Sequence, residues 1–232
     1  MGKVIMSGIV PQLVAPKKPG LELSTIAEGS IVKLNENGSP VEFYVAKHNY
    51  ESGLNGAGRT LLVRKDTYME GTTNTVVWDS DNTGVYPACT LDGWFNSTYK
   101  AVLDDAVQTA IGTTNIYCGT AITSLVVASC ARGIFALSMT ELGFTDSNYI
   151  PVEGSALPIA SKLLIAYFNG TATGQASRTY YRNNGNYYFL VNRSGSKVYR
   201  NKSSSEGYPR PAFTLPSTAK FDAETLLFKG VS

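Results

Sequence analysis

The chain has 232 residues, of which 43% are hydrophobic and 16% charged, with a formal net charge of +2. This length fits one large domain or two small ones with a proper core, and a charge so near zero gives no global argument for nucleic acid or membranes. No run of about 18 apolar residues is present and no secretory signal is recognisable, so we expect no membrane span and synthesis in a cytoplasm.

Residues 1–22 are expected to be an arm. Pro11, Pro16 and Pro19 break any helix, and the apolar residues between them have no regular period. Two interpretations remain open, because such an arm could be disordered or could dock onto a neighbouring subunit.

Three strands are expected next. Residues 30–34 and 41–46 flank Asn37-Gly38, a strong hairpin signal because both central positions of a type I′ turn need a positive φ. Residues 60–64 read as a third strand. The following stretch is polar and irregular, with Trp78 as its expected anchor.

Two short helices are expected between Thr90 and Gly112. Thr90 is the predicted N-cap, and the apolar residues that follow have helical spacing. Asp104 and Asp105 start the second helix, so the junction is placed near Lys100. A strand is then predicted at residues 133–138.

Two further helices and three further strands are predicted in the rest of the chain. Ser138 and Glu141 form a capping box for a short helix at residues 138–144, and residues 157–170 read as a helix stopped by Gly170. Strands are expected at residues 187–192, 196–200 and 210–217. The order of strands, helices and strands predicts an α+β fold with one mixed or antiparallel sheet.

No catalytic chemistry is recognisable. The single histidine, His48, has no adjacent Cys or His, and no nucleophile, phosphate-loop, zinc or calcium motif is present. We therefore expect no enzymatic activity, no catalytic residues, no metal and no cofactor. The odd number of cysteines, Cys89, Cys118 and Cys130, favours reduced, buried thiols.

The most distinctive segment runs from Arg178 to Tyr208. It contains six Tyr, five Asn, four Arg and five Ser, and it has six basic residues against one acid, Glu206. Such a composition suits a binding surface, in which Tyr supplies contact area at low entropy cost and Ser and Asn supply hydrogen bonds. A plain exposed sheet and a single-stranded nucleic-acid site remain as alternatives. We favour the binding surface and expect no nucleic-acid partner.

Strand alternation within this segment sorts four neighbouring side chains. Tyr187 and Phe189 are expected on one face of the strand, and Tyr188 and Leu190 on the other. Only one of these two pairs is expected to be at the surface.

Several strings together resemble an uncharacterised domain family that is abundant in tailed phages and prophages of gut bacteria. They are GSIVKLNENGSPVEFYVAKHNYESGLNGAGRTLLVRKDTY, WDSDN, LDGWFNSTYKAVL, LSMTELGF, VEGSALPIASKLLIAYFNG and PRPAFTLPS. They occur in family order and span about residues 29–217, which is nearly the whole chain.

The resemblance implies a C-type lectin-like fold with a mixed or antiparallel sheet and two or three short flanking helices. The domain would occupy residues 23–220, with a C-terminal tail at 221–232 and a ligand surface at 180–208. Relatives often carry a Trp-x-Arg-Ser-Pro-like stretch where this chain reads ATGQASRTYYRNN, so the packing aromatic is expected to be either absent or replaced by Tyr180 or Tyr181. The segment also resembles the variable region of a target protein of a diversity-generating retroelement.

The function expected from this resemblance is ligand binding on a virion. The chain would be a tail or fibre-tip receptor-binding subunit that recognises a host-cell surface protein or glycan. Its arm would contact other virion proteins, and a homo-oligomer is expected, with a trimer favoured. The alternative is a decoration or cement protein on the capsid. The expected ligand contacts are Tyr180, Tyr181, Arg182, Asn183, Asn184, Tyr187, Asn192, Arg193, Lys197, Tyr199 and Arg200.

Overall fold

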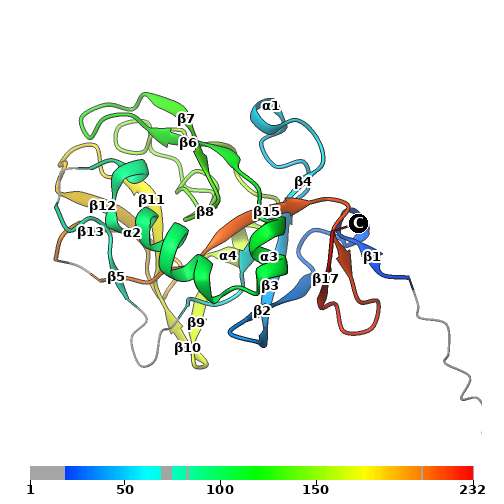
Figure 1. Ribbon diagram of the computed structural model, residues 1–232. Helices are drawn as coiled ribbons and strands as arrows, with labels where there is room; N and C mark the ends of the chain where they lie inside the picture. The colour runs from blue at the N-terminus through cyan, green and yellow to red at the C-terminus, as the bar shows by residue number, and fades with distance from the viewer. Residues whose placement is uncertain (1–18, 69–74, 82–83, 205, 232) are drawn as a thin grey trace, which may run out of the picture.

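A five-stranded antiparallel sheet forms the centre of the protein (Figure 1). The computed structural model describes residues 19–68, 75–81, 84–204 and 206–231. The order of the strands is β2 (Ile31–Glu36), β3 (Ser39–Lys47), β4 (Arg59–Arg64), β15 (Ala212–Pro216) and β8 (Ile134–Phe135). The predicted closing strand is therefore an inner strand, which joins segments that are far apart in the sequence.

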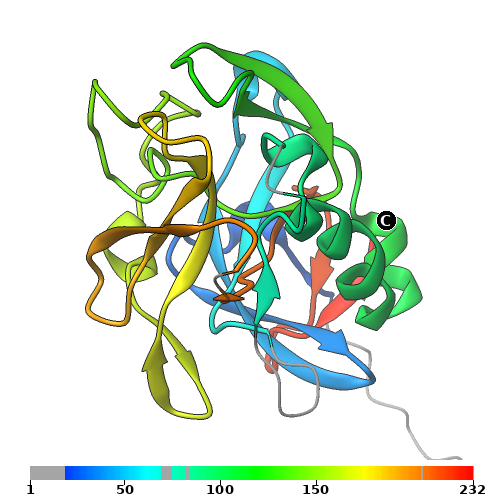
Figure 2. The ribbon, with the colours of Figure 1, turned by 90° about the vertical axis from the view of Figure 1, so that its left-hand side faces the viewer.

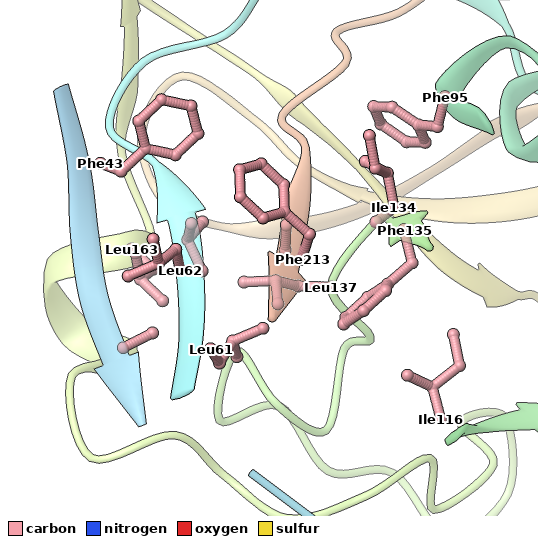
Figure 3. Packing of buried hydrophobic residues seen from close by; sticks show 14 of the residues in the cluster. Phe43, Leu61, Leu62, Phe95, Ile116, Ile134, Phe135, Leu137, Leu163 and Phe213 are labelled. Carbon is pink, nitrogen blue, oxygen red and sulfur yellow. The ribbon is translucent and has the colours of Figure 1, made fainter. Parts of the chain in front are cut away.

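The core is built on the side chains of this sheet (Figure 3). Leu62 of β4 lies opposite Phe213 of β15 in the strand register, and the Phe213 ring packs 5.5 Å from that of Phe43 on β3. All three side chains have no exposed surface. Burial of such apolar surface is the main free-energy gain that holds the strands together.

The predicted β2–β3 hairpin is confirmed. Asn37 has a φ of 50° and Gly38 a φ of 73°, as a type I′ turn requires. The predicted strand at residues 60–64 is confirmed as β4, and Trp78 is a fully buried anchor. A one-turn helix, α1 (Ser52–Asn55), lies between β3 and β4.

A continuous helical run follows the irregular segment. It comprises α2 (Thr90–Trp94), a π-helical stretch η3 (Phe95–Tyr99) and a 3-10 turn η4 (Lys100–Val102), and α3 (Asp105–Ala110) comes after a break. Asn96 donates to the Ile134 carbonyl on β8, while Asn37 N–H donates to the Val102 carbonyl beside β2. The run thus reaches both edge strands of the central sheet.

The predicted N-cap of this run is wrong by one residue. Cys89 is the cap, and its Sγ accepts from the Asp92 N–H at 3.4 Å. Thr90 is the first helical residue, and its Oγ1 accepts instead from the Ser80 N–H at 2.9 Å. Asp104 precedes the second helix, as expected, because its extended backbone separates the two helices.

Two predicted helices are also wrong. Residues 157–170 contain only a short helix, α4 (Ala160–Leu163), and the strand β9 (Ala166–Phe168), which forms a hairpin with β10 (Thr171–Thr173). Asn169 and Gly170 have φ values of 47° and 77°, so a second Asn-Gly turn reverses the chain where a helix was expected. Residues 138–144 form turns instead of a helix, although their capping box is present.

The hairpin of β6 (Thr114–Gly119) and β7 (Val127–Arg132) carries a disulfide between Cys118 and Cys130. This corrects the expectation that all three cysteines are reduced. The antiparallel register brings the two residues close, and that proximity was not visible in their spacing along the chain. Cys89 is free and buried.

The two ends of the described chain meet in a small sheet. β1 (Leu21–Glu22) pairs with β16 (Lys220–Phe221), which pairs with β17 (Phe228–Gly230). Residues 1–18 of the expected arm lie outside the described residues. The expected tail contributes β17 to this sheet.

The architecture is mixed α+β, with mostly antiparallel sheets and few short helices, as the sequence predicted. The expectation of one sheet is wrong, because the described strands form several separate sheets. Two short strands, β5 (Val76–Val77) and β14 (Glu206–Gly207), pair with each other, and two further 3-10 turns are η1 (Leu23–Thr25) and η2 (Tyr86–Ala88). Within the described ranges, no helix is long and apolar enough to span a membrane.

Candidate functional site

The Tyr-rich segment folds into a three-stranded antiparallel sheet of β11 (Gln175–Tyr180), β12 (Tyr187–Val191) and β13 (Lys197–Asn201). β12 and β13 confirm two predicted strands, whereas β11 was not predicted. Figure 1 shows this sheet at the left edge of the molecule and the terminal sheet of β1, β16 and β17 at the right. In Figure 2 the same sheet, yellow to orange, faces the viewer on the left.

The inner face of β12 belongs to the protein core. The Tyr188 ring stacks on that of Trp78 at 5.4 Å and 20°, and the Trp78 indole N–H donates to the Ser177 carbonyl on β11 at 2.8 Å. Phe189, on the other face, is also buried, and only Tyr187 is half exposed. The expectation that one of the two pairs forms the surface is therefore wrong, because neighbouring side chains cover Phe189.

Phe189 lines a groove formed largely by aromatic side chains, and the Tyr181 ring packs against it. The Tyr181 and Tyr199 rings are parallel, at 4.8 Å and 3°, and the Tyr187 ring meets Tyr199 edge-on at 5.5 Å. Tyr199 is 51% exposed. The groove has a volume of about 490 Å³ and is lined by Asp146, Tyr149, Tyr181, Phe189, Lys197, Val198, Tyr199 and Arg200. We call this feature the aromatic groove.

One wall of the aromatic groove comes from a distant turn. Asp146 accepts from the Lys197 ammonium at 3.1 Å, and this hydrogen bond is the main cause that lowers the pKa of the Asp146 carboxyl. Tyr149 packs 5.4 Å from Tyr181, and its carbonyl accepts from the Arg182 N–H. Asp146 and Tyr149 were not predicted, because they lie more than 30 residues before the strand that they contact.

Whereas the first groove lies on the face of Phe189, a second, more polar groove lies on the other face of this sheet, the face of Leu190. It has a volume of about 740 Å³, and we call it the arginine groove because Arg193 and Arg200 both line it, together with Asn192, Ser204 and Tyr208. The two grooves therefore lie on opposite faces of β13, which is the outer strand of its sheet, and Arg200 lines both.

The asparagines of the segment have a structural role that its composition did not reveal. The Asn192 side-chain carbonyl accepts from the N–H groups of Ser194 and Ser196, and so fixes the β12–β13 turn. Asn184 Oδ1 accepts from the Asn186 N–H in the same way. Such Asx turns explain much of the Asn and Ser content without a ligand.

Tyr180 is wrong as a surface contact. Its side chain is buried, and its hydroxyl donates to the Ser124 carbonyl. Burial raises the Tyr180 pKa to about 12. The hydroxyl is committed to the loop after β6 and has no surface to offer to a ligand.

The other predicted contacts fall into two groups. Arg182, Asn183, Asn184, Arg193, Tyr199 and Arg200 are exposed, while Tyr181, Tyr187, Asn192 and Lys197 are half buried. Tyr181, Lys197, Tyr199 and Arg200 meet at the aromatic groove. Asn183 and Asn184 lie on the β11–β12 turn and line neither groove.

Both ring nitrogens of His48 have hydrogen-bond partners within the fold. Its Nε2 lies 3.0 Å from the Ile26 carbonyl and its Nδ1 lies 2.9 Å from Thr60 Oγ1, so both nitrogens hold the fold. In the part of the chain that the structure describes, no group of three or more His, Cys, Asp or Glu side chains could hold a metal ion.

A family model described as a domain of unknown function, DUF6273, matches residues 57–217. The chain belongs to this family. The matched region contains both grooves and the closing strand β15, and it excludes the terminal sheet. No curated protein and no solved structure matches the chain.

Proposed function

We propose that this member of the DUF6273 family is a ligand-binding protein on the surface of a phage particle, at a tail or fibre tip. The ligand would be a component of the host-cell surface, and the aromatic groove would be its contact site. The observation that carries the proposal is the half-exposed ring of Tyr199, held parallel to Tyr181 beside an open groove.

The groove has the physical properties of an efficient contact surface. Tyr181, Tyr187 and Tyr199 are packed against one another before any ligand arrives. Little side-chain entropy would then be lost on binding, and immobilising a flexible side chain costs about 1 kcal/mol. The adjacent Lys197–Asp146 pair adds a donor and an acceptor that can orient a bound molecule.

The position of the groove supports display on a particle. The terminal sheet holds the first described strand, β1, and lies at the opposite side of the molecule from β13 (Figure 1). Attachment through the preceding residues would leave the groove facing outward. Several copies on one particle would raise the avidity, so a weak single site would be sufficient.

A C-type lectin-like body is part of this proposal. The meeting of the chain ends in one sheet, the inner position of the closing strand β15, and a candidate surface built just before that strand all support it.

The test is binding of purified protein to host cells. Tyr199→Ala and Tyr181→Ala should each lower binding while leaving the melting temperature within a few degrees of the wild type. Tyr167→Ala is the matched control, because Tyr167 is a 44% exposed tyrosine on β9, outside both grooves.

Two results would contradict the proposal. Equal binding by the wild type and the Tyr199 variant would show that the aromatic groove is not the contact site for the ligand. No cell binding by the wild type, together with binding to capsid shells, would instead favour a decoration protein.

A further inference from the structure

Some basic side chains of the Tyr-rich segment are buried or ion-paired, and others are exposed. Arg178 is fully buried against Glu141, at 2.7 Å, and Lys197 pairs with Asp146. Lys202 is buried over the Trp78 ring, 5.0 Å from its centroid. These three serve the fold or are neutralised at the groove wall, which leaves Arg182, Arg193 and Arg200 as the exposed basic residues of the segment.

Arg193 and Arg200 line the same groove from the β12–β13 turn and from β13, respectively. Arg193 lies in the turn that Asn192 fixes, and Arg200 lies on the paired strand β13. Among the described side chains, no carboxylate lies within ion-pair distance of either guanidinium. Arg200 Nη1 donates to the Tyr199 carbonyl at 3.0 Å, and Arg200 lines both grooves.

Two guanidinium groups beside one polar groove favour a negatively charged ligand. A guanidinium is always charged, is more weakly hydrated than an ammonium, and can bind a carboxylate or phosphate through two parallel hydrogen bonds. Both arginines line this groove, so an anion bound there would be attracted by two positive charges.

We infer that the ligand is an anionic glycopolymer whose phosphate or carboxylate groups bind Arg193 and Arg200 while a sugar ring packs on Tyr199. This inference rests on the proposed function and assigns the charge of the ligand. β13 is the outer strand of its sheet and Arg200 lines both grooves, so a polymer that passes over this edge would contact both of them.

The shape of the surface favours a polymer of small units over a folded protein partner. The two hollows hold about 490 and 740 Å³, volumes typical of sites for small molecules. A chain of repeating units that passes over the edge at β13 can place one group in each hollow.

The first experiment measures the affinity of the full-length protein for three immobilised polymers. They are poly(glycerol phosphate), polygalacturonate and uncharged dextran. The wild type should bind one or both anionic polymers and not dextran, and binding should weaken as salt rises because exposed charges are screened. Preference for the first or second polymer identifies phosphate or carboxylate as the bound group.

Two double variants test whether Arg193 and Arg200 bind the anionic groups of the polymer. Arg193→Gln/Arg200→Gln should lower affinity for the anionic polymer by at least about tenfold, given the usual strength of charge-assisted hydrogen bonds. Lys65→Gln/Lys220→Gln removes the same charge from remote ion pairs and should bind like the wild type. An equal loss in both variants would overturn the inference, because it would reflect net charge alone.

Binding to host cells separates this inference from the proposed function. If Tyr199→Ala abolishes cell binding but Arg193→Gln/Arg200→Gln binds cells normally, the anionic ligand is overturned and the proposed function stands. Loss of binding after protease treatment of the cells would overturn the glycopolymer in favour of a protein. Failure of the wild type to bind cells would contradict the proposed function itself.

Discussion

Arg178 and Glu141 form an ion pair in which neither side chain has any exposed surface, with 2.7 Å between Arg178 Nη1 and Glu141 Oε2. All five guanidinium N–H donors have an acceptor, since the carbonyls of Tyr117, Ala136 and Glu153 accept the three that Glu141 does not. The pair ties β11 to the turns after β8. Arg178 thus stabilises the fold, although it belongs to the segment that the composition predicted to be a binding surface.

Glu141→Gln should therefore destabilise the fold. The substitution keeps the shape but removes the charge that compensates buried Arg178, and breaking a buried pair costs about 3–5 kcal/mol. Urea denaturation measures this cost. Glu42→Gln is the control, since the Lys65–Glu42 pair is 34% and 42% exposed and should contribute less than about 1 kcal/mol. Equal losses in the two variants would contradict the account.

Lys202 should make stability depend on pH. Burial lowers its pKa to about 8, below the ordinary 10.5 of an unfolded lysine. Between these values the unfolded chain binds more protons, so the penalty for burying the charge is largest below about pH 8 and is relieved as pH rises.

Lys202→Met should remove this dependence. The stability of the wild type relative to the variant should rise by about 1 kcal/mol per pH unit between pH 8 and 10. Urea denaturation of both proteins at pH 7, 8, 9 and 10 gives the difference. A constant difference across this range would mean that Lys202 has an ordinary pKa.

The cysteines give a chemical test of the fold. Cys118 and Cys130 should appear as a linked peptide pair by mass spectrometry without reductant, and cleaving this link should cost about 3 kcal/mol for a loop of this size. Burial raises the pKa of the Cys89 thiol to about 12, so it should resist alkylation until the protein unfolds. Rapid alkylation of Cys89 in the folded protein would contradict its burial.

The sequence predicted elements whose signals are local. Asn37-Gly38 specifies its own turn, and β12, β13 and β15 have strand-like apolar runs. β11 was missed because Gln175, Ser177 and Arg178 look exposed in sequence, yet all three are buried and satisfied by distant partners. The Asn169-Gly170 turn was overlooked because an apolar run before it resembled a helix.

The candidate site was predicted in part, for a similar reason. Composition identified Tyr181, Lys197, Tyr199 and Arg200, which do meet at the aromatic groove. Composition cannot distinguish an exposed tyrosine from one that stacks in the core, so Tyr180 was misplaced. Asp146 comes from another part of the chain, and only the folded topology brings it to β13.

If the segment is varied by a retroelement, the substitutions should follow exposure. Related copies of the gene should differ at residues 182–184, 193, 199 and 200, which are exposed, and keep Arg178 and Tyr188, which are buried. Sequencing of many clones and of the neighbouring DNA tests this. The absence of a template repeat or a reverse transcriptase beside the gene would exclude the mechanism.

The central claim is that the aromatic groove binds the host surface, and competition with the phage tests it most directly. Purified wild-type protein, added in excess to host cells, should block adsorption of the parent phage, whereas Tyr199→Ala at the same concentration and with the same melting temperature should not. Unchanged adsorption in the presence of saturating wild-type protein would contradict the claim.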